Sequence, residues 1–232
     1  MYAEHGHLET ISDELTLWKY MDFSKFVNIL TTNQIWFNKI KYFEDVFEGT
    51  YPTANKEKRV EIYDGDLIPQ HIYDAAENYQ RERLYVTCFH NNEYESAAMW
   101  SLYGKDAGIA IKTTGERLKK CFKKEEKNIY ITPIAYIDYK KDFLPEGNLF
   151  YLGTHKRKSF VHENEVRCLY LNQKQFVDNK GESINIDVLE LIEEIYISPY
   201  APKYMFDTVK KLISQFGYDI PVINSPLYTL NK

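Results

Sequence analysis

The stretch from Lys158 to Tyr170, KSFVHENEVRCLY, is the feature that most constrains the fold. On an extended chain the side chains alternate between two faces, so Glu163, Glu165 and Arg167 share one face. The opposite face carries apolar and small side chains that can pack on a core: Asn164, Val166, Cys168 and Tyr170. Two carboxylates and a guanidinium on one strand face are more typical of the wall of a polar cleft than of an ordinary surface strand. The stretch therefore predicts a strand that carries a functional site.

Composition limits the class of protein. The 232 residues suffice for one domain with a substantial core. The ten glycines form neither a G-x-G-x-x-G nor a G-x-x-x-x-G-K-[ST] run, which argues against a Rossmann site or a P-loop. A net charge of −5 argues against a general nucleic-acid coat. Three widely spaced cysteines indicate a reducing compartment, and we expect a cytoplasmic protein without membrane segments.

Hydrophobic periodicity and capping residues predict an α+β fold. We expect short, mostly antiparallel strands in two small sheets with a central cleft, flanked by helices. Residues 1–14 are expected to be a loose N-terminal lead-in, and residues 15–232 a single α+β domain. The predicted strands are 15–20, 34–38, 84–90, 108–112, 165–171 and 218–223. The predicted helices begin at residues 22–24 and 69, at 94 and 114, and at 202.

Four short stretches together resemble a widespread bacterial family of unknown function. Members of this family read roughly Y-K-Y, F-N-D-P-F-E, M-W-x-x-Y and W-x-x-E-x-E-x-R. The corresponding stretches here are Leu17–Tyr20 (LWKY), Phe43–Glu48 (FEDVFE), Met99–Gly104 (MWSLYG) and Phe160–Arg167 (FVHENEVR). This sequence departs from the pattern at Glu44, Val46 and Phe160, where the family has Asn, Pro and Trp.

The order of these residues also shows a distant likeness to ADP-ribosyltransferases, which bind NAD in a cleft between two small sheets. The likeness implies that NAD is the substrate and that a protein or nucleic acid is a possible acceptor. It also implies a role as a bacterial toxin or antiviral effector. Glu165 or Glu163 would then hold the ribose and stabilise an oxocarbenium ion, and Arg167 would lower the pKa of a neighbouring carboxyl. The other candidates are Tyr20, Trp100 and Tyr103 for stacking, and Lys19, Lys156 and Arg157 for phosphates.

Other interpretations of the same residues stay open. Glu165 and Arg167 are equally consistent with a structural ion pair that has Asp45 or Glu48 as a further partner. Met99, Trp100 and their neighbours are more often core than cofactor site. The leading hypothesis expects no metal, but a metal-dependent nuclease or phosphohydrolase would instead use four carboxylates: Asp45, Glu48, Glu163 and Glu165. A third alternative is a non-catalytic cleft that binds a nucleotide or a protein.

Overall fold

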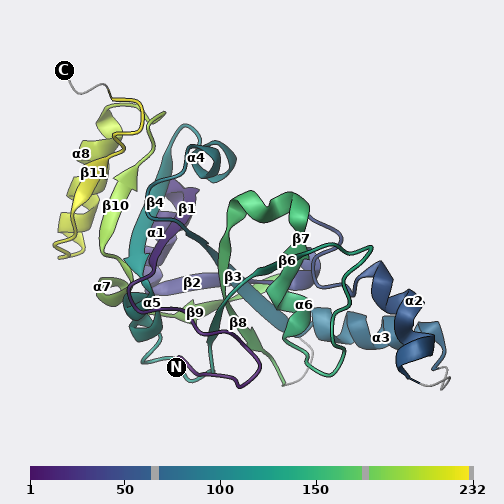
Figure 1. Ribbon diagram of the computed structural model, residues 1–232. Coiled ribbons are helices and arrows are strands. Elements are labelled where there is room, and N and C mark those ends of the chain that lie inside the picture. Colours follow the sequence, from purple (N-terminus) through teal and green to yellow (C-terminus); the bar gives the residue numbers. More distant parts are fainter. Residues whose placement is uncertain (64–67, 174–177, 230–232) are drawn as a thin grey trace.

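The computed structural model describes residues 1–63, 68–173 and 178–229, and confirms the α+β class (Figure 1). Within these ranges the main sheet has nine strands, and the path β11-β10-β4-β1-β3-β2-β9 runs through it, with β8 beside β3 and β5 beside β8. Two further strands, β6 and β7, form a small second sheet. Strand pairs in the main sheet are antiparallel except β10 with β11. The main sheet is thus larger than the small sheets we expected.

The predicted strands 15–20, 34–38, 84–90, 108–112 and 165–171 match observed strands closely, whereas the predicted strand 218–223 is wrong in its bounds, because the last strand spans only Val222–Asn224. The strands are β1 (Thr16–Asp22), β2 (Gln34–Lys39), β3 (Leu84–Asn91), β4 (Gly108–Thr114), β5 (Tyr130–Pro133), β6 (Ala135–Ile137), β7 (His155–Arg157), β8 (Glu165–Leu171), β9 (Gly181–Asn185), β10 (Glu194–Ile197) and β11 (Val222–Asn224). The α-helices are α1 (Phe23–Thr32), α2 (Thr53–Ile62), α3 (Gln70–Arg81), α4 (Ala97–Tyr103), α5 (Gly115–Cys121), α6 (Tyr151–Thr154), α7 (Val188–Leu191) and α8 (Tyr204–Gln215). Two 3₁₀ helices span Ile40–Tyr42 and Lys158–Glu163.

Local chemistry explains the β1–α1–β2 unit. The carboxylate of Asp22 accepts a hydrogen bond from the backbone N–H of Lys25 (2.9 Å) and caps α1. Asn33 ends the helix in the left-handed conformation (φ 53°), which Asn tolerates better than most residues. In β2, Ile35 and Phe37 are buried whereas Trp36 is exposed, as the alternation predicts.

The main sheet forks beside β3. One edge of β3 pairs with β8 from Leu84 to His90. At the other edge, β1 pairs with β3 only through Leu17 and Trp18, and β2 pairs only through Asn38 and Lys39. The described strands β1 and β2 therefore diverge, and they leave the stretch 87–89 of β3 without a strand partner on that edge. Helix α1 joins the two diverging strands.

The core explains which faces of the sheet are buried. Val166, Cys168 and Tyr170 of β8 belong to the large apolar cluster, as predicted, whereas Glu165 and Arg167 lie on the opposite face. Glu163 differs from the prediction because β8 begins at Glu165 and Glu163 ends the preceding 3₁₀ helix. Asn164 between them has a left-handed backbone (φ 37°), and this turn breaks the strand. Asn164 is therefore exposed, and the prediction that it shares the core face of Val166 is wrong.

The N-terminal lead-in is held against the rest of the chain. Ala3 donates its backbone N–H to the carbonyl of Ile129 (2.9 Å). Ile11 is 6% exposed and packs in the large apolar cluster. These contacts differ from the loose lead-in that we expected for residues 1–14.

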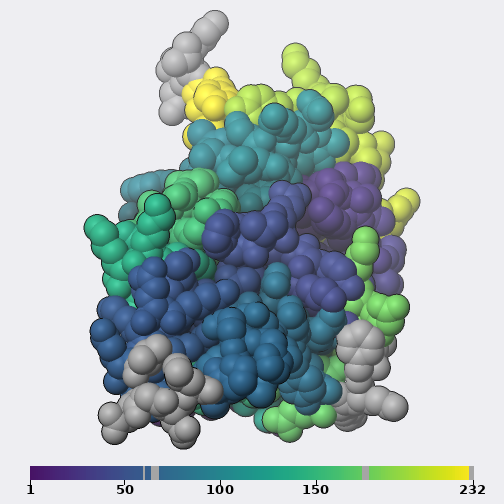
Figure 2. All heavy atoms as spheres, turned by 90° about the vertical axis from the view of Figure 1, so that its right-hand side faces the viewer, coloured from purple at the N-terminus to yellow at the C-terminus, as the bar shows by residue number. Residues whose placement is uncertain are grey.

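Helices α2 and α3 lie together on one side of the molecule (Figure 2). The segment that follows β2 (indigo) lies in the middle of this face, with α2 and α3 (blue) below it and the α4 segment (teal) above. No helix in the described ranges is both long enough and apolar enough to cross a bilayer.

Candidate active site

A cavity of about 700 Å³ lies at the fork between β1 and β2. Its lining comes from the diverging strands, from α1, from the loop after β2, and from the polar cluster at the start of β8. Directly paired residues of adjacent strands share a face, so the pairs Trp18–His90 and His90–Glu165 place these side chains on one side of the sheet. The pair Asn38–Val86 adds Asn38 to the same side. The fork thus brings residues from four strands to one cavity.

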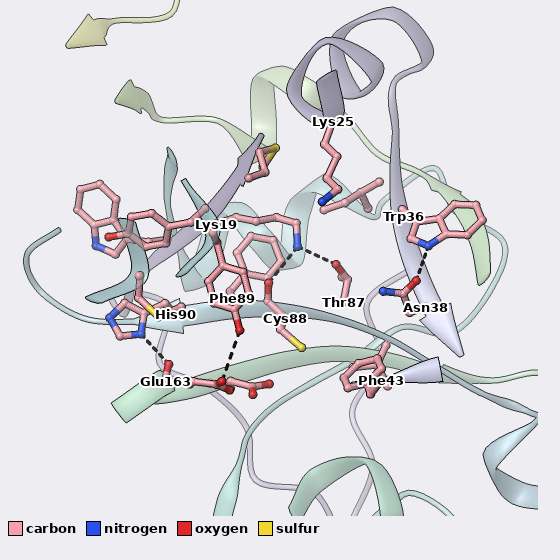
Figure 3. A pocket seen from close by; sticks show the side chains of 18 of the residues that line it. Lys19, Lys25, Trp36, Asn38, Phe43, Thr87, Cys88, Phe89, His90 and Glu163 are labelled. Atoms are coloured by element: carbon pink, nitrogen blue, oxygen red, sulfur yellow. Dashed lines mark hydrogen bonds between the residues drawn. The ribbon is translucent and has the colours of Figure 1, made fainter. Parts of the chain in front are cut away.

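Lys19 fills the gap in the sheet (Figure 3). Its Nζ donates to the hydroxyl of Thr87 (2.9 Å) and to the carbonyl oxygen of Cys88 (3.0 Å), in the stretch of β3 that lacks a strand partner. Both acceptors are neutral, and no carboxylate in the described ranges lies within 4.0 Å of this ammonium. Burial lowers the pKa of Lys19 because desolvation disfavours its charged form. An ammonium whose two hydrogen-bond acceptors are neutral favours binding of an anion in the cavity.

Three carboxylates and two cations form a buried network on the opposite side of the cavity. Arg167, which is fully buried, donates Nε to Glu165 (2.7 Å) and both terminal nitrogens to Glu48 (3.0 Å each). Lys156 donates to Glu165 (2.7 Å) and Glu163 and lies 3.0 Å from a carboxylate oxygen of Glu48. The bidentate pair of Arg167 with Glu48 is the strong geometry for such ions. This network confirms that Glu48 is a further partner of Arg167.

The network contains three carboxylates but two cations, and Glu163 is the carboxyl whose pKa is raised. Burial and its hydrogen bond with Glu165 raise the pKa of Glu163 to about 7. Burial alone would raise the pKa of Glu165 as well, but Arg167 and the hydrogen bond with Glu163 lower it well below its ordinary value. Two neighbouring carboxyls with separated pKa values suit acid–base chemistry, because one stays ionised while the other exchanges a proton near neutral pH.

Neighbouring side chains orient the two carboxyls. The hydroxyl of Tyr103 lies 3.4 Å from Oε1 of Glu163, and Nδ1 of His90 donates to the backbone carbonyl of Glu163 (2.6 Å). The backbone N–H of Glu165 donates to the hydroxyl of Tyr136 (2.9 Å). Burial lowers the pKa of His90, so the imidazole is neutral and its Nδ1 carries the proton.

Six of the sequence-based candidates line the cavity. They are Lys19, Tyr20, Tyr103, Lys156, Glu163 and Glu165. Three other candidates, Arg167, Trp100 and Arg157, do not line the cavity. Arg167 lies behind the carboxylates, and Trp100 is fully buried in the apolar cluster beside Trp18 and Tyr20. Arg157 forms an ion pair with Asp45 (2.7 Å) and stacks on Phe47 at 4.2 Å from the ring centroid. Lys156 lines the cavity with its ammonium engaged by carboxylates, so Lys19 has the freer positive charge.

The carboxylates meet around a cation that belongs to the protein. Glu48, Glu163 and Glu165 converge on the ammonium of Lys156, which takes the central position that a divalent ion would need. Asp45, the fourth carboxylate of the metal-dependent alternative, is bound by Arg157 instead. No group of three His, Cys, Asp or Glu side chains in the described ranges has a geometry suited to a metal ion. This arrangement gives the metal-dependent alternative no support.

Several polar or aromatic lining residues were not among the sequence-based site candidates, and they include Trp36, Asn38, Thr87 and His90. A signal for the first two was present, because alternation in β2 directs Trp36 and Asn38 away from the face of Ile35 and Phe37. Thr87 and His90 belong to the predicted strand 84–90, and which of its side chains reach the cavity depends on where β1 leaves β3.

No protein-family model matches the chain, and no curated protein matches it.

Proposed function

We propose that the protein is an NAD-consuming enzyme of ADP-ribosyltransferase type. The observation that carries the proposal is the pair Glu163–Glu165 in one cavity with Lys19, an ammonium that donates to neutral acceptors and pairs with no carboxylate among the described residues. The substrate of such an enzyme carries two negative phosphates and a ribose that becomes positively charged in the transition state. The cavity offers a cation for the first and carboxylates for the second.

The reaction breaks the bond between C1′ of the ribose and the nicotinamide nitrogen. The bonding electron pair leaves with nicotinamide, and positive charge develops on the ribose ring. The ionised Glu165 stabilises this charge, because its low pKa keeps it anionic. An acceptor oxygen or nitrogen then bonds to C1′, and Glu163 takes the proton that the acceptor loses.

The remaining residues position these groups. Arg167, itself paired with Glu48, holds the carboxyl of Glu165 from behind, and Lys156 bridges the carboxyls of Glu163 and Glu165. Tyr20 and Tyr103 supply aromatic surface beside the carboxyls. The acceptor is a protein or a nucleic acid in this proposal, and the biological role is that of a bacterial toxin or antiviral effector.

Nicotinamide release from NAD by the purified protein tests the proposal. We expect release by wild type, and a loss of about 100-fold or more in Glu163→Gln and Glu165→Gln. Glu116→Gln is the matched control, because Glu116 is exposed and pairs only with Lys120 in the helix α5. The kcat/KM of wild type should rise with pH through about 7 as Glu163 loses its proton, and this limb should be absent in Glu163→Gln.

Failure of the proposal has a clear signature. The transferase proposal is wrong if two results are both negative. The protein would release no nicotinamide from NAD, with water or with candidate acceptors present, and NAD would not raise the melting temperature of the protein. If NAD binds equally well to wild type and Glu165→Gln and is never cleaved, the chain is a nucleotide-binding module without catalysis.

A further inference from the structure

Trp36 is held as an open aromatic platform at the cavity. Trp18 and Trp100 are 2% and 0% exposed, whereas Trp36 is 47% exposed. One face of its indole packs on Gly181 of β9, where an added Cβ would lie only 2.6 Å from the ring. Its Nε1 donates to Oδ1 of Asn38 (2.6 Å). The packing and the hydrogen bond fix the ring, and among the described residues no aromatic ring or cation stacks on its other face.

The platform lies in the same cavity as the carboxylates but away from them. In the view of Figure 3, Lys19 and Thr87 lie between Glu163 on one side and Trp36 with Asn38 on the other. A ligand that spans the cavity would therefore meet carboxylates at one end, an ammonium near its middle, and an aromatic ring at the far end. A dinucleotide has this order of groups: ribose, phosphates and a second base.

We propose that Trp36 and Asn38 form the adenine-binding subsite of the cavity, which defines its substrate as an adenine dinucleotide. This inference rests on the proposed function, because it assigns the far end of the same substrate. The free face of the indole stacks on the planar base. Among the described residues, no partner takes the Nδ2 donors of Asn38, so this amide can donate to N7 of adenine.

The amide also has acceptor capacity for the base. Its carbonyl oxygen keeps a second lone pair after it accepts the hydrogen bond from Trp36, and this lone pair can accept from the N6 amino group. Bidentate pairing of Asn with N6 and N7 distinguishes adenine from other bases. The subsite therefore supplies both affinity, through stacking, and selectivity, through the amide.

Tryptophan fluorescence gives a direct test with AMP and nicotinamide mononucleotide as probes. AMP carries the adenine half of NAD, and nicotinamide mononucleotide carries the other half. Because Trp36 is the exposed member of the three tryptophans, AMP should quench the emission of wild type. Trp36→Ala should weaken AMP binding, measured by calorimetry, by about 5- to 150-fold, the range for loss of a base–aromatic stack. Trp36→Phe should retain most of the affinity, and Tyr94→Ala, which removes an exposed ring outside the cavity, should retain all of it.

The outcomes separate this inference from the proposed function. Loss of AMP affinity in Trp36→Ala, with unchanged affinity for nicotinamide mononucleotide, supports the subsite even if no variant ever cleaves NAD. Unchanged AMP affinity in Trp36→Ala overturns the subsite, even if Glu163→Gln abolishes nicotinamide release. Selective loss of nicotinamide mononucleotide binding would also overturn it, because the dinucleotide would then lie in the opposite orientation. Equal affinity for AMP and UMP in wild type would overturn the role of Asn38.

Discussion

Replacement of Arg167 by Met should strongly destabilise the fold. Arg167 is fully buried and donates four hydrogen bonds, two to Glu48 and one each to Glu165 and Gly153. The variant leaves three buried carboxylates with Lys156 as their single cation. Removing one partner of a buried ion pair costs about 3–5 kcal/mol, a large part of the ~5–15 kcal/mol that stabilises a typical domain.

Urea unfolding followed by far-UV circular dichroism measures this effect. For a chain of this size, a loss of 3–5 kcal/mol corresponds to a fall in Tm of about 6–20 °C. Lys25→Met is the control, because Lys25 and Asp22 form an exposed pair (2.9 Å) that should contribute less than about 1 kcal/mol. The slope of the free energy of unfolding against urea concentration should not change if only stability differs.

The double variant Arg167→Met with Glu48→Leu separates charge balance from packing. It removes one cation and one carboxylate, so Lys156 keeps Glu163 and Glu165 and the excess of negative charge returns to that of wild type. We expect the double variant to be more stable than Arg167→Met alone, since apolar replacement of a buried pair is often nearly neutral. A single variant within about 1 kcal/mol of wild type would refute the reasoning. A double variant as unstable as the single one would refute it as well.

Three further predictions concern protonation and reactivity. Because burial raises the pKa of Glu163 from 4.5 to about 7, the folded chain binds this proton more tightly than the unfolded chain. This contribution to stability is lost as pH rises through 7. The Tm of wild type should therefore fall relative to that of Glu163→Gln between about pH 5 and pH 8, and parallel Tm curves for the two proteins would contradict the raised pKa. Lys19→Met should lower the free energy of unfolding by only about 1–2 kcal/mol, because it removes hydrogen bonds to neutral acceptors. The same variant should bind AMP about tenfold or more weakly in calorimetry. Equal AMP affinity of wild type and variant would show that Lys19 does not contact the phosphate. Burial raises the pKa of Cys121 and Cys168, so iodoacetamide at neutral pH should alkylate them slowly in the native protein and readily in denaturant. Rapid native labelling of either thiol, seen by mass spectrometry, would contradict its burial.

Local chemistry made much of the fold predictable from the sequence. Alternation along β8 identified Val166, Cys168 and Tyr170 as its core face, because a strand has a period of two residues. Asp22 or Ser24 was the predicted cap at the start of α1 and Asn33 its predicted end, and the structure has Asp22 and Asn33 as the caps. Such ends are predictable because capping depends on side chains within a few positions of the helix terminus. The α+β class followed from such elements. These features share one property, which is that neighbouring residues decide them.

The candidate site depended on distant pairings that the sequence does not encode locally. Arg167 meets Glu48 across 119 positions of sequence, and this contact makes Arg167 a buried support behind the cavity. Trp100 was a stacking candidate by residue type, but the packing of α4 against β1 buries it completely. Lys19 reaches Thr87 only because β1 leaves β3 after Trp18. The sequence by itself determined which side chains carry charge and which faces are apolar, whereas tertiary structure decided which charges neutralise one another and which remain for a ligand, because electrostatic pairing depends on distance in space.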